Sequence, residues 1–248
     1  MERTSWRRRA RAFVPALLLL FALAGWMLPA APGPAAEADA VLEAGEGEPC
    51  PTVPAGQKLI ALTFDDGPSK RYTPAILDAL KEYGANATFF VLGSNADNFP
   101  DILQRMVLEG NEIGNHTYSH KQLTTLSKEN IEEEIIATQE SIYDITHRYP
   151  DVIRPPYGSK NKTVMDCAKG KRIVTWSLDT RDWHDRDAKV VVERLLKQVQ
   201  DGDIILMHDL YASTASAVQE LVPRLQEQGY QLVTVSDLYT YSRHIRHS

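Results

Sequence analysis

From Lys58 onward the sequence alternates short apolar runs with amphipathic segments, and this alternation limits the fold more than any other feature. The apolar runs predict strands over 58–64, 86–92, 111–115, 172–178, 203–207 and 231–235, with a weaker one at 151–154. The segments between them predict helices over 73–83, 97–109, 127–147, 161–169, 187–200 and 214–228. Strands that alternate with helices predict a parallel sheet with helical crossovers, built either as a barrel or as an open doubly wound sheet.

The first 38 residues have the layout of an export segment. Five arginines precede an apolar run over 12–28, and small residues follow, with two Ala-x-Ala sites at 36–38 and 38–40. We expect residues 1–38 to be either a cleaved signal peptide or a retained membrane anchor. A segment rich in Pro, Ala, Gly and Glu follows and predicts a linker over 39–56. The working domain, 57–243, is therefore expected outside the cytoplasm, either secreted or held at the membrane.

The charge balance and the cysteines add smaller constraints. A formal net charge of −6 at pH 7 argues against nucleic acid or an anionic membrane face as a binding partner. Neutral and cationic polymers remain as partners, and the oligomeric state is left open. Cys50 and Cys167 are the two cysteines of the sequence, and they are compatible either with a disulfide between linker and domain or with two separate thiols.

Two adjacent carboxylates follow the first predicted strand, in the stretch Thr63-Phe-Asp65-Asp66-Gly-Pro68. The apolar run breaks here at a Gly-Pro turn, so both acids are delivered to the end of a strand, where chemistry is usually placed. Side-by-side acids repel each other and cost stability. A cation or a catalytic task is therefore the expected reason for the pair.

Two histidines follow the strand predicted over 111–115, in the stretch His116-Thr-Tyr-Ser-His120. Histidines four residues apart bind one ion when the segment forms a helical turn. A solvated pair is the ordinary alternative, but placement at a strand end in the same domain as the acids favours ligation. Two imidazoles and one carboxylate leave coordination positions open for water, which indicates a hydrolytic metal site.

Three later motifs also fall at or just beyond predicted strands: Arg154-Pro-Pro-Tyr157-Gly, Asp182-Trp183, and Leu206-Met-His208. Each has an ordinary explanation, respectively a proline turn, a salt bridge beside a core aromatic, and a buried histidine. Their joint placement with the acids and histidines predicts one shared site, because strand ends of a parallel sheet meet on one face.

This ordered set of motifs resembles the polysaccharide deacetylase family, also called the NodB-homology family or carbohydrate esterase family 4. The resemblance covers about residues 57–240. It implies an α/β fold, a distorted (β/α) barrel of about seven parallel strands in a single domain, with the site at the carboxyl ends of the strands.

The resemblance also implies roles for the first part of the set. Asp65 would be the general base and Arg154 would orient it. Asp66, His116 and His120 would bind a divalent metal, for which Zn²⁺ is the first expectation and Co²⁺ or Ni²⁺ fit the same ligands.

The remaining implied roles concern the substrate and its leaving group. The Tyr157 backbone N–H would help to hold the oxyanion, and Trp183 and Leu206 would line a pocket for the acetyl methyl group. His208 would be the general acid, with Asp182 tuning the charged network around either Arg154 or His208.

The implied activity is removal of N-acetyl groups from N-acetylglucosamine units of a polysaccharide such as peptidoglycan or chitin, with release of acetate. One alternative is an O-acetyl esterase that acts on a glycan such as acetylxylan through the same residues. A second alternative is a non-catalytic carbohydrate-binding domain, against which the complete set of acids and histidines argues.

Overall fold

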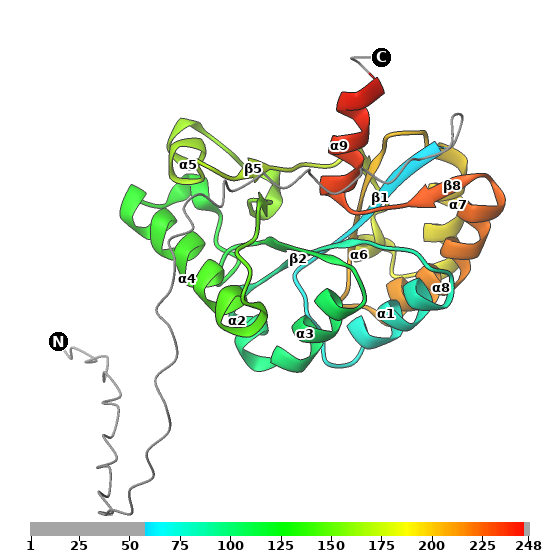
Figure 1. The fold of residues 1–248 in the computed structure, drawn as a ribbon, viewed down its shortest axis with the longest axis horizontal. Coiled ribbons are helices and arrows are strands. Elements are labelled where there is room, and N and C mark those ends of the chain that lie inside the picture. The colour runs from blue at the N-terminus through cyan, green and yellow to red at the C-terminus, as the bar shows by residue number, and fades with distance from the viewer. Residues whose placement is uncertain (1–57, 246–248) are drawn as a thin grey trace, which may run out of the picture. The chain divides into compact units, whose positions relative to one another are not determined.

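The computed structural model describes residues 58–245, and in this range the strands are short and mutually parallel (Figure 1). The strands are β1 Lys58–Asp65, β2 Thr88–Val91, β3 Glu112–Asn115, β4 Val152–Ile153, β5 Arg172–Ile173, β6 Leu178–Asp179, β7 Ile204–His208 and β8 Tyr230–Leu232. They form one curled sheet in the order β5-β4-β3-β2-β1-β7-β6, with β8 paired to β1. The fold is thus the distorted barrel that the resemblance implies.

Helices connect most of the consecutive strands, and the main core lies between these helices and one face of the sheet. They are α1 Thr73–Glu82, α2 Gly93–Asn98, α3 Pro100–Leu108, α4 Lys128–Thr146, α5 Lys162–Cys167, α6 Asp182–Asp185, α7 Ala188–Gln198, α8 Ala212–Glu227 and α9 Val235–Ile245. Two 3-10 turns, η1 Leu123–Thr125 and η2 Pro156–Gly158, lie beside the strand ends. Helix crossovers between parallel strands confirm the expectation from the sequence.

Strand β1 runs through the middle of the sheet and has two different faces. One face is apolar along the whole strand, and the other is apolar at its start and polar at its end. Ile60, Leu62 and Phe64 belong to the main core under the helices, whereas Leu59 and Ala61 belong to a second cluster on the opposite face. Because strand side chains alternate, Thr63 and Asp65 share the face of Leu59 and Ala61. Thr63 and Asp65 therefore point into the barrel, whereas Phe64 between them points into the core.

The strand predicted over 172–178 is two strands, and the reason is topological. Val174 N–H donates to the Ile153 carbonyl of β4 at 2.9 Å, but Ser177 N–H donates to the Ile204 carbonyl of β7, also at 2.9 Å. The segment thus leaves one edge of the sheet and joins the other. A single apolar run in the sequence gives no sign of this exchange of partners.

Two further predictions were wrong in detail. The helix predicted over 97–109 is interrupted before Pro100, because proline lacks an N–H and disfavours helical backbone in the residue before it. The strand predicted over 231–235 gives way to helix α9. Thr234 and Asp237 bond reciprocally there, through Thr234 Oγ1 to Asp237 Oδ2 at 2.6 Å and Asp237 N–H to Thr234 Oγ1 at 3.1 Å.

No helix within residues 58–245 is both long enough and apolar enough to cross a bilayer. The predicted export segment, 1–38, and the linker, 39–56, lie outside the described residues. Cys50 lies there too, so its pairing with Cys167 stays a prediction.

Candidate active site and metal centre

Asp65 ends β1 with a nearly buried carboxylate that is held by a fully buried arginine. Arg154 Nη1 donates to Asp65 Oδ1 at 2.7 Å and also lies 2.8 Å from Thr63 Oγ1. The Arg154 guanidinium also packs on the Phe90 ring, with its Cζ 4.1 Å from the ring centre. Burial lowers the pKa of Arg154, although Asp65 opposes that shift. A buried, paired arginine fixes the orientation of the Asp65 carboxylate.

Asp66 turns the other way and faces two imidazoles. Its Oδ1 lies 3.3 Å from His116 Nε2 and 3.1 Å from His120 Nε2. Asp66 has a left-handed backbone with φ of 74°, which aspartate tolerates better than most residues. One ligand atom from each of these three residues lies within 4.8 Å of the others. The backbone reversal between Asp65 and Asp66 therefore separates two neighbouring acids into two environments.

The three residues fit a divalent transition metal. His116 Nδ1 lies 2.6 Å from the Arg154 carbonyl, so it donates its proton there and leaves the Nε2 lone pair facing Asp66. Asp66 Oδ1 is buried and receives no hydrogen bond from the described residues. Burial raises the pKa of Asp66, but its interactions with the surrounding imidazoles, of which His116 contributes most, together outweigh burial and hold that pKa below its usual value. A carboxylate oxygen with no donor beside two imidazole nitrogens is a site suited to a cation.

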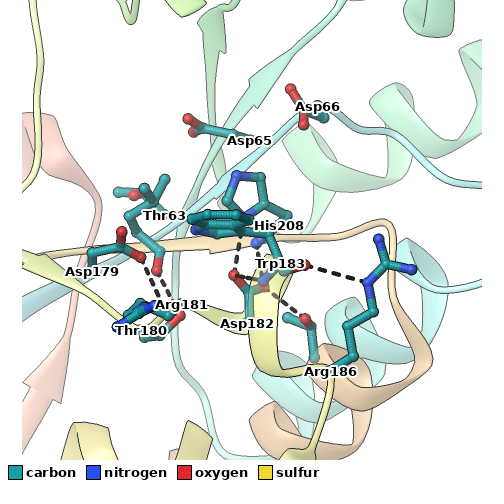
Figure 2. A network of polar contacts seen from close by, with 12 residues as sticks. Thr63, Asp65, Asp66, Asp179, Thr180, Arg181, Asp182, Trp183, Arg186 and His208 are labelled. Carbon is teal, nitrogen blue, oxygen red and sulfur yellow. Dashed lines mark hydrogen bonds and ion pairs between the residues drawn. The ribbon is translucent and has the colours of Figure 1, made fainter. Parts of the chain in front are cut away.

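His208 ends β7 directly beside Asp65 in the sheet register and forms a pair with Asp182 (Figure 2). His208 Nδ1 lies 2.9 Å from Asp182 Oδ1, and Asp182 Oδ2 accepts from His208 N–H at 2.8 Å and from Thr214 Oγ1 at 2.7 Å. Burial opposes the charge on His208, but the hydrogen bond and charge of Asp182 prevail and raise the pKa of His208 to about 9. His208 is thus held protonated at neutral pH, which suits a proton donor.

These groups surround one pocket of about 470 Å³. The lining residues are Asp65, Asp66, His116, His120, Tyr157, Trp176, Asp179, Trp183, Leu206, His208 and Tyr211. Tyr157 lies in the turn of η2 with a left-handed φ of 61°. Its peptide N–H donates to none of the described residues. That group is therefore available to a ligand oxygen in the pocket.

The residues singled out in the sequence are brought together here. Eight of them line the pocket, and Arg154 and Asp182 lie behind Asp65 and His208 respectively. Of the two partners expected for Asp182, His208 is the one that it contacts. Sequence reasoning gave no role to Trp176, Asp179 or Tyr211, whose only signal was proximity to a predicted strand or to His208.

Asp209 is a further residue that sequence reasoning left without a role. It is fully buried, and Thr73 Oγ1 donates to its Oδ2 at 2.5 Å. A Cβ at Gly67 would lie 2.1 Å from the same oxygen, so only glycine leaves room for the carboxylate. Burial raises the pKa of Asp209 to about 7. The Asp209 carboxylate packs against Gly67, the residue after Asp66. Asp209 therefore connects the turn that follows β1 to the end of β7.

The chain is similar to several known proteins. The model of the polysaccharide deacetylase family matches residues 52–174. The chain is similar to peptidoglycan-N-acetylmuramic acid deacetylase PdaC of Bacillus subtilis, with 48% identity over 187 residues that cover 75% of this chain and 40% of PdaC. It is also similar to peptidoglycan-N-acetylglucosamine deacetylase PgdA of Listeria monocytogenes, with 43% identity over 191 residues, 76% of this chain and 41% of PgdA.

The chain spans about two fifths of the length of these two relatives. A solved structure of PdaC from Bacillus subtilis matches with a TM-score of 0.75 at 45% identity, over 77% of this chain and 94% of that one.

Proposed function

This chain belongs to the polysaccharide deacetylase family, and on that premise we propose that it is a metal-dependent hydrolase that removes N-acetyl groups from peptidoglycan. The observation that carries the proposal is the pairing of Asp65 with His208 across the β1–β7 register, beside the Asp66, His116 and His120 triad. A base and an acid on either side of a candidate metal site are what amide hydrolysis requires.

The residues of the chain divide the reaction between them. Asp65 accepts a proton from the attacking water, and the hydrogen bond from Arg154 holds that carboxylate in its orientation. The free N–H of Tyr157 donates to the oxygen of the acetyl carbonyl as negative charge develops on it, a contribution that is about 3 kcal/mol for single donors elsewhere. His208 then protonates the departing amine, because an amine anion is a very poor leaving group.

We propose Zn²⁺ as the ion, with Co²⁺ and Ni²⁺ as ions that the same ligands accept. Asp66, His116 and His120 would hold it. When bound, such an ion lowers the pKa of water and polarises a carbonyl group.

Removal of an O-acetyl group from a glycan is the second candidate activity, since the same residues would serve it. The similarity to PdaC and PgdA, which are named as peptidoglycan deacetylases, favours N-acetyl groups. A pure binding role is disfavoured. Arg154 orients Asp65, and Asp182 orients His208, so two groups able to transfer protons are held in place. A protein that only binds a glycan needs neither group. Peptidoglycan as the substrate also agrees with an exported domain.

One assay tests the proposal. Acetate release is measured from peptidoglycan, chitin oligosaccharides and acetylxylan, after treatment with a chelator and again after addition of Zn²⁺. We expect release from peptidoglycan that is lost on chelation and restored by the ion. Release from acetylxylan alone would favour the esterase, and no release from any of the three would favour a binding domain.

A further inference from the structure

Arg186 follows helix α6 at the rim of the pocket and is anchored to two of its walls. Its guanidinium carbon lies 4.5 Å from the centre of the Tyr211 ring, and its Nε donates to the Trp183 carbonyl at 3.3 Å. Both Tyr211 and Trp183 line the pocket. Figure 2 shows the Arg186 side chain extending beside Trp183, with the dashed contact to that residue.

The end of this guanidinium has no partner in the described part of the chain. The face of the Arg186 guanidinium contacts the Tyr211 ring, and its Nε donates to the Trp183 carbonyl. The N–H donors on Nη1 and Nη2 have no partner among the described residues. No ion pair with a described carboxylate is formed by Arg186. The neighbouring acids are engaged elsewhere: Asp185 with Arg194 and His184, Asp187 with the first N–H groups of α7, and Asp182 with His208.

Arg186 is exposed, and it places a positive charge at the rim of the pocket. Its orientation is fixed in advance by the ring and by the carbonyl, so little conformational freedom is lost when it binds a planar anion. The fork of Nη donors matches a carboxylate in two parallel hydrogen bonds. The ligand chemistry that fits this position is therefore a carboxylate carried by the glycan.

We propose that Arg186 is a specificity-determining residue that binds a carboxylate on, or next to, the sugar whose acetyl group is removed. The proposal rests on the proposed function and deepens it, by assigning acidic N-acetylated glycans as the preferred substrate class over neutral ones. In peptidoglycan such a carboxylate has two sources: the lactyl group of muramic acid and the attached peptide.

The test compares kcat and KM of the wild type, Arg186→Gln and Arg186→Lys, all loaded with Zn²⁺. The substrates are a neutral N-acetylchitooligosaccharide, a peptide-free glycan of alternating N-acetylglucosamine and N-acetylmuramic acid, the same glycan with its lactyl carboxylates converted to methyl amides, and a peptide-bearing glycan. Arg148→Gln is the matched control. It removes the same charge from the loop between α4 and β4, which adds no side chain to the pocket.

We expect Arg186→Gln to lower kcat/KM on the acidic glycans by about 10- to 100-fold, mainly through KM, since a charged hydrogen-bonding pair is lost. Its effect on the neutral and amidated glycans should stay within about twofold, and Arg186→Lys should restore part of the loss. Lactyl recognition predicts the drop on the peptide-free glycan, whereas peptide recognition predicts it only on the peptide-bearing one.

An equal loss on all substrates would mean that Arg186 only supports Trp183 and Tyr211, and no loss on either acidic glycan would also overturn the inference. A wild type that prefers the neutral oligosaccharide would overturn it while leaving the proposed deacetylase function intact. A wild type that releases no acetate from any glycan would instead contradict the proposed function itself.

Discussion

Two groups of residues in the pocket combine a carboxylate with imidazole. Asp182 and His208 form the proton-holding corner, and Asp66 with its two histidines, His116 and His120, forms the cation corner. The two corners differ in how many hydrogen-bond donors the carboxylate has. Asp182 accepts hydrogen bonds from His208, Thr214 and the Trp183 N–H, so both of its oxygens have donors. Asp66 Oδ1 has no donor among the described residues and faces two imidazole nitrogens. The hydrogen-bond inventory, rather than the residue types, separates a proton-holding pair from a cation site.

The tautomers of the histidines follow from the same difference. His116 gives its Nδ1 proton to a backbone carbonyl, which turns a lone pair toward Asp66. His208 directs Nδ1 at a carboxylate, which stabilises the doubly protonated ring and raises its pKa to about 9. If the two corners are separate, changes in the cation corner should affect metal content, and changes in the proton-holding corner should affect the pH dependence of activity.

Loss of one imidazole at the cation corner should have the largest effect. His116→Ala should strip the bound metal and lower kcat/KM by about 10⁴-fold or more, because the ion contributes several kcal/mol to the transition state. Metal content is measured by elemental analysis of the purified protein. His147→Ala is the control, since that histidine is exposed at the end of α4 and should keep its metal. A full equivalent of metal in His116→Ala would remove this residue from the ligand set.

The next effect tests the division of labour between the two adjacent aspartates. Asp65→Asn should lower kcat by about 10³-fold, since a general base is lost, while the metal content stays unchanged. Asp66→Asn serves as the contrast and should lose metal. Near-native activity in Asp65→Asn would mean that another group takes the proton from water.

The proton-holding corner is tested by the pH dependence of activity. Asp182 raises the pKa of His208, so Asp182→Asn should lower that pKa and move the alkaline limb of kcat/KM from about pH 9 toward neutral pH. At the optimum we expect a loss of about 10²-fold. The profile is measured with the metal-loaded protein, and an alkaline limb that stays in place would assign it to a group other than His208.

The smallest effect on activity concerns Asp209, which connects the two corners. Its pKa is about 7 in the folded chain against an ordinary 3.8, so between about pH 4 and 7 the folded state holds a proton that the unfolded state has released. The free energy of unfolding should therefore fall as pH rises through this window.

Asp209→Asn should remove that fall. When the pH is raised from 5 to 8, the free energy of unfolding of the variant should therefore rise by about 1–4 kcal/mol relative to that of the wild type. The measurement is urea unfolding at both pH values, with kcat expected to change by less than about tenfold. Equal pH slopes in the two proteins would show that Asp209 stays ionised when folded.

The sequence allowed much of the fold to be predicted because its signals are local. Apolar runs that alternate with amphipathic segments marked β1, β2, β3 and β7 to within two residues at each end. The predictions failed where a single residue or the tertiary context overrode the local pattern. Pro100 divides one amphipathic stretch into two helices, and the run over 172–178 changes its sheet partner from β4 to β7.

The candidate site divides in the same way. The sequence by itself determined which residue types follow which strands, and a parallel sheet then places those residues on one face. Only the tertiary structure decided that Asp182 pairs with His208, that Asp209 lies under Gly67, and that Arg186 stacks on Tyr211. The physical reason is that these contacts depend on register, backbone reversal and hydrogen-bond satisfaction between segments far apart in the chain, which no local pattern encodes.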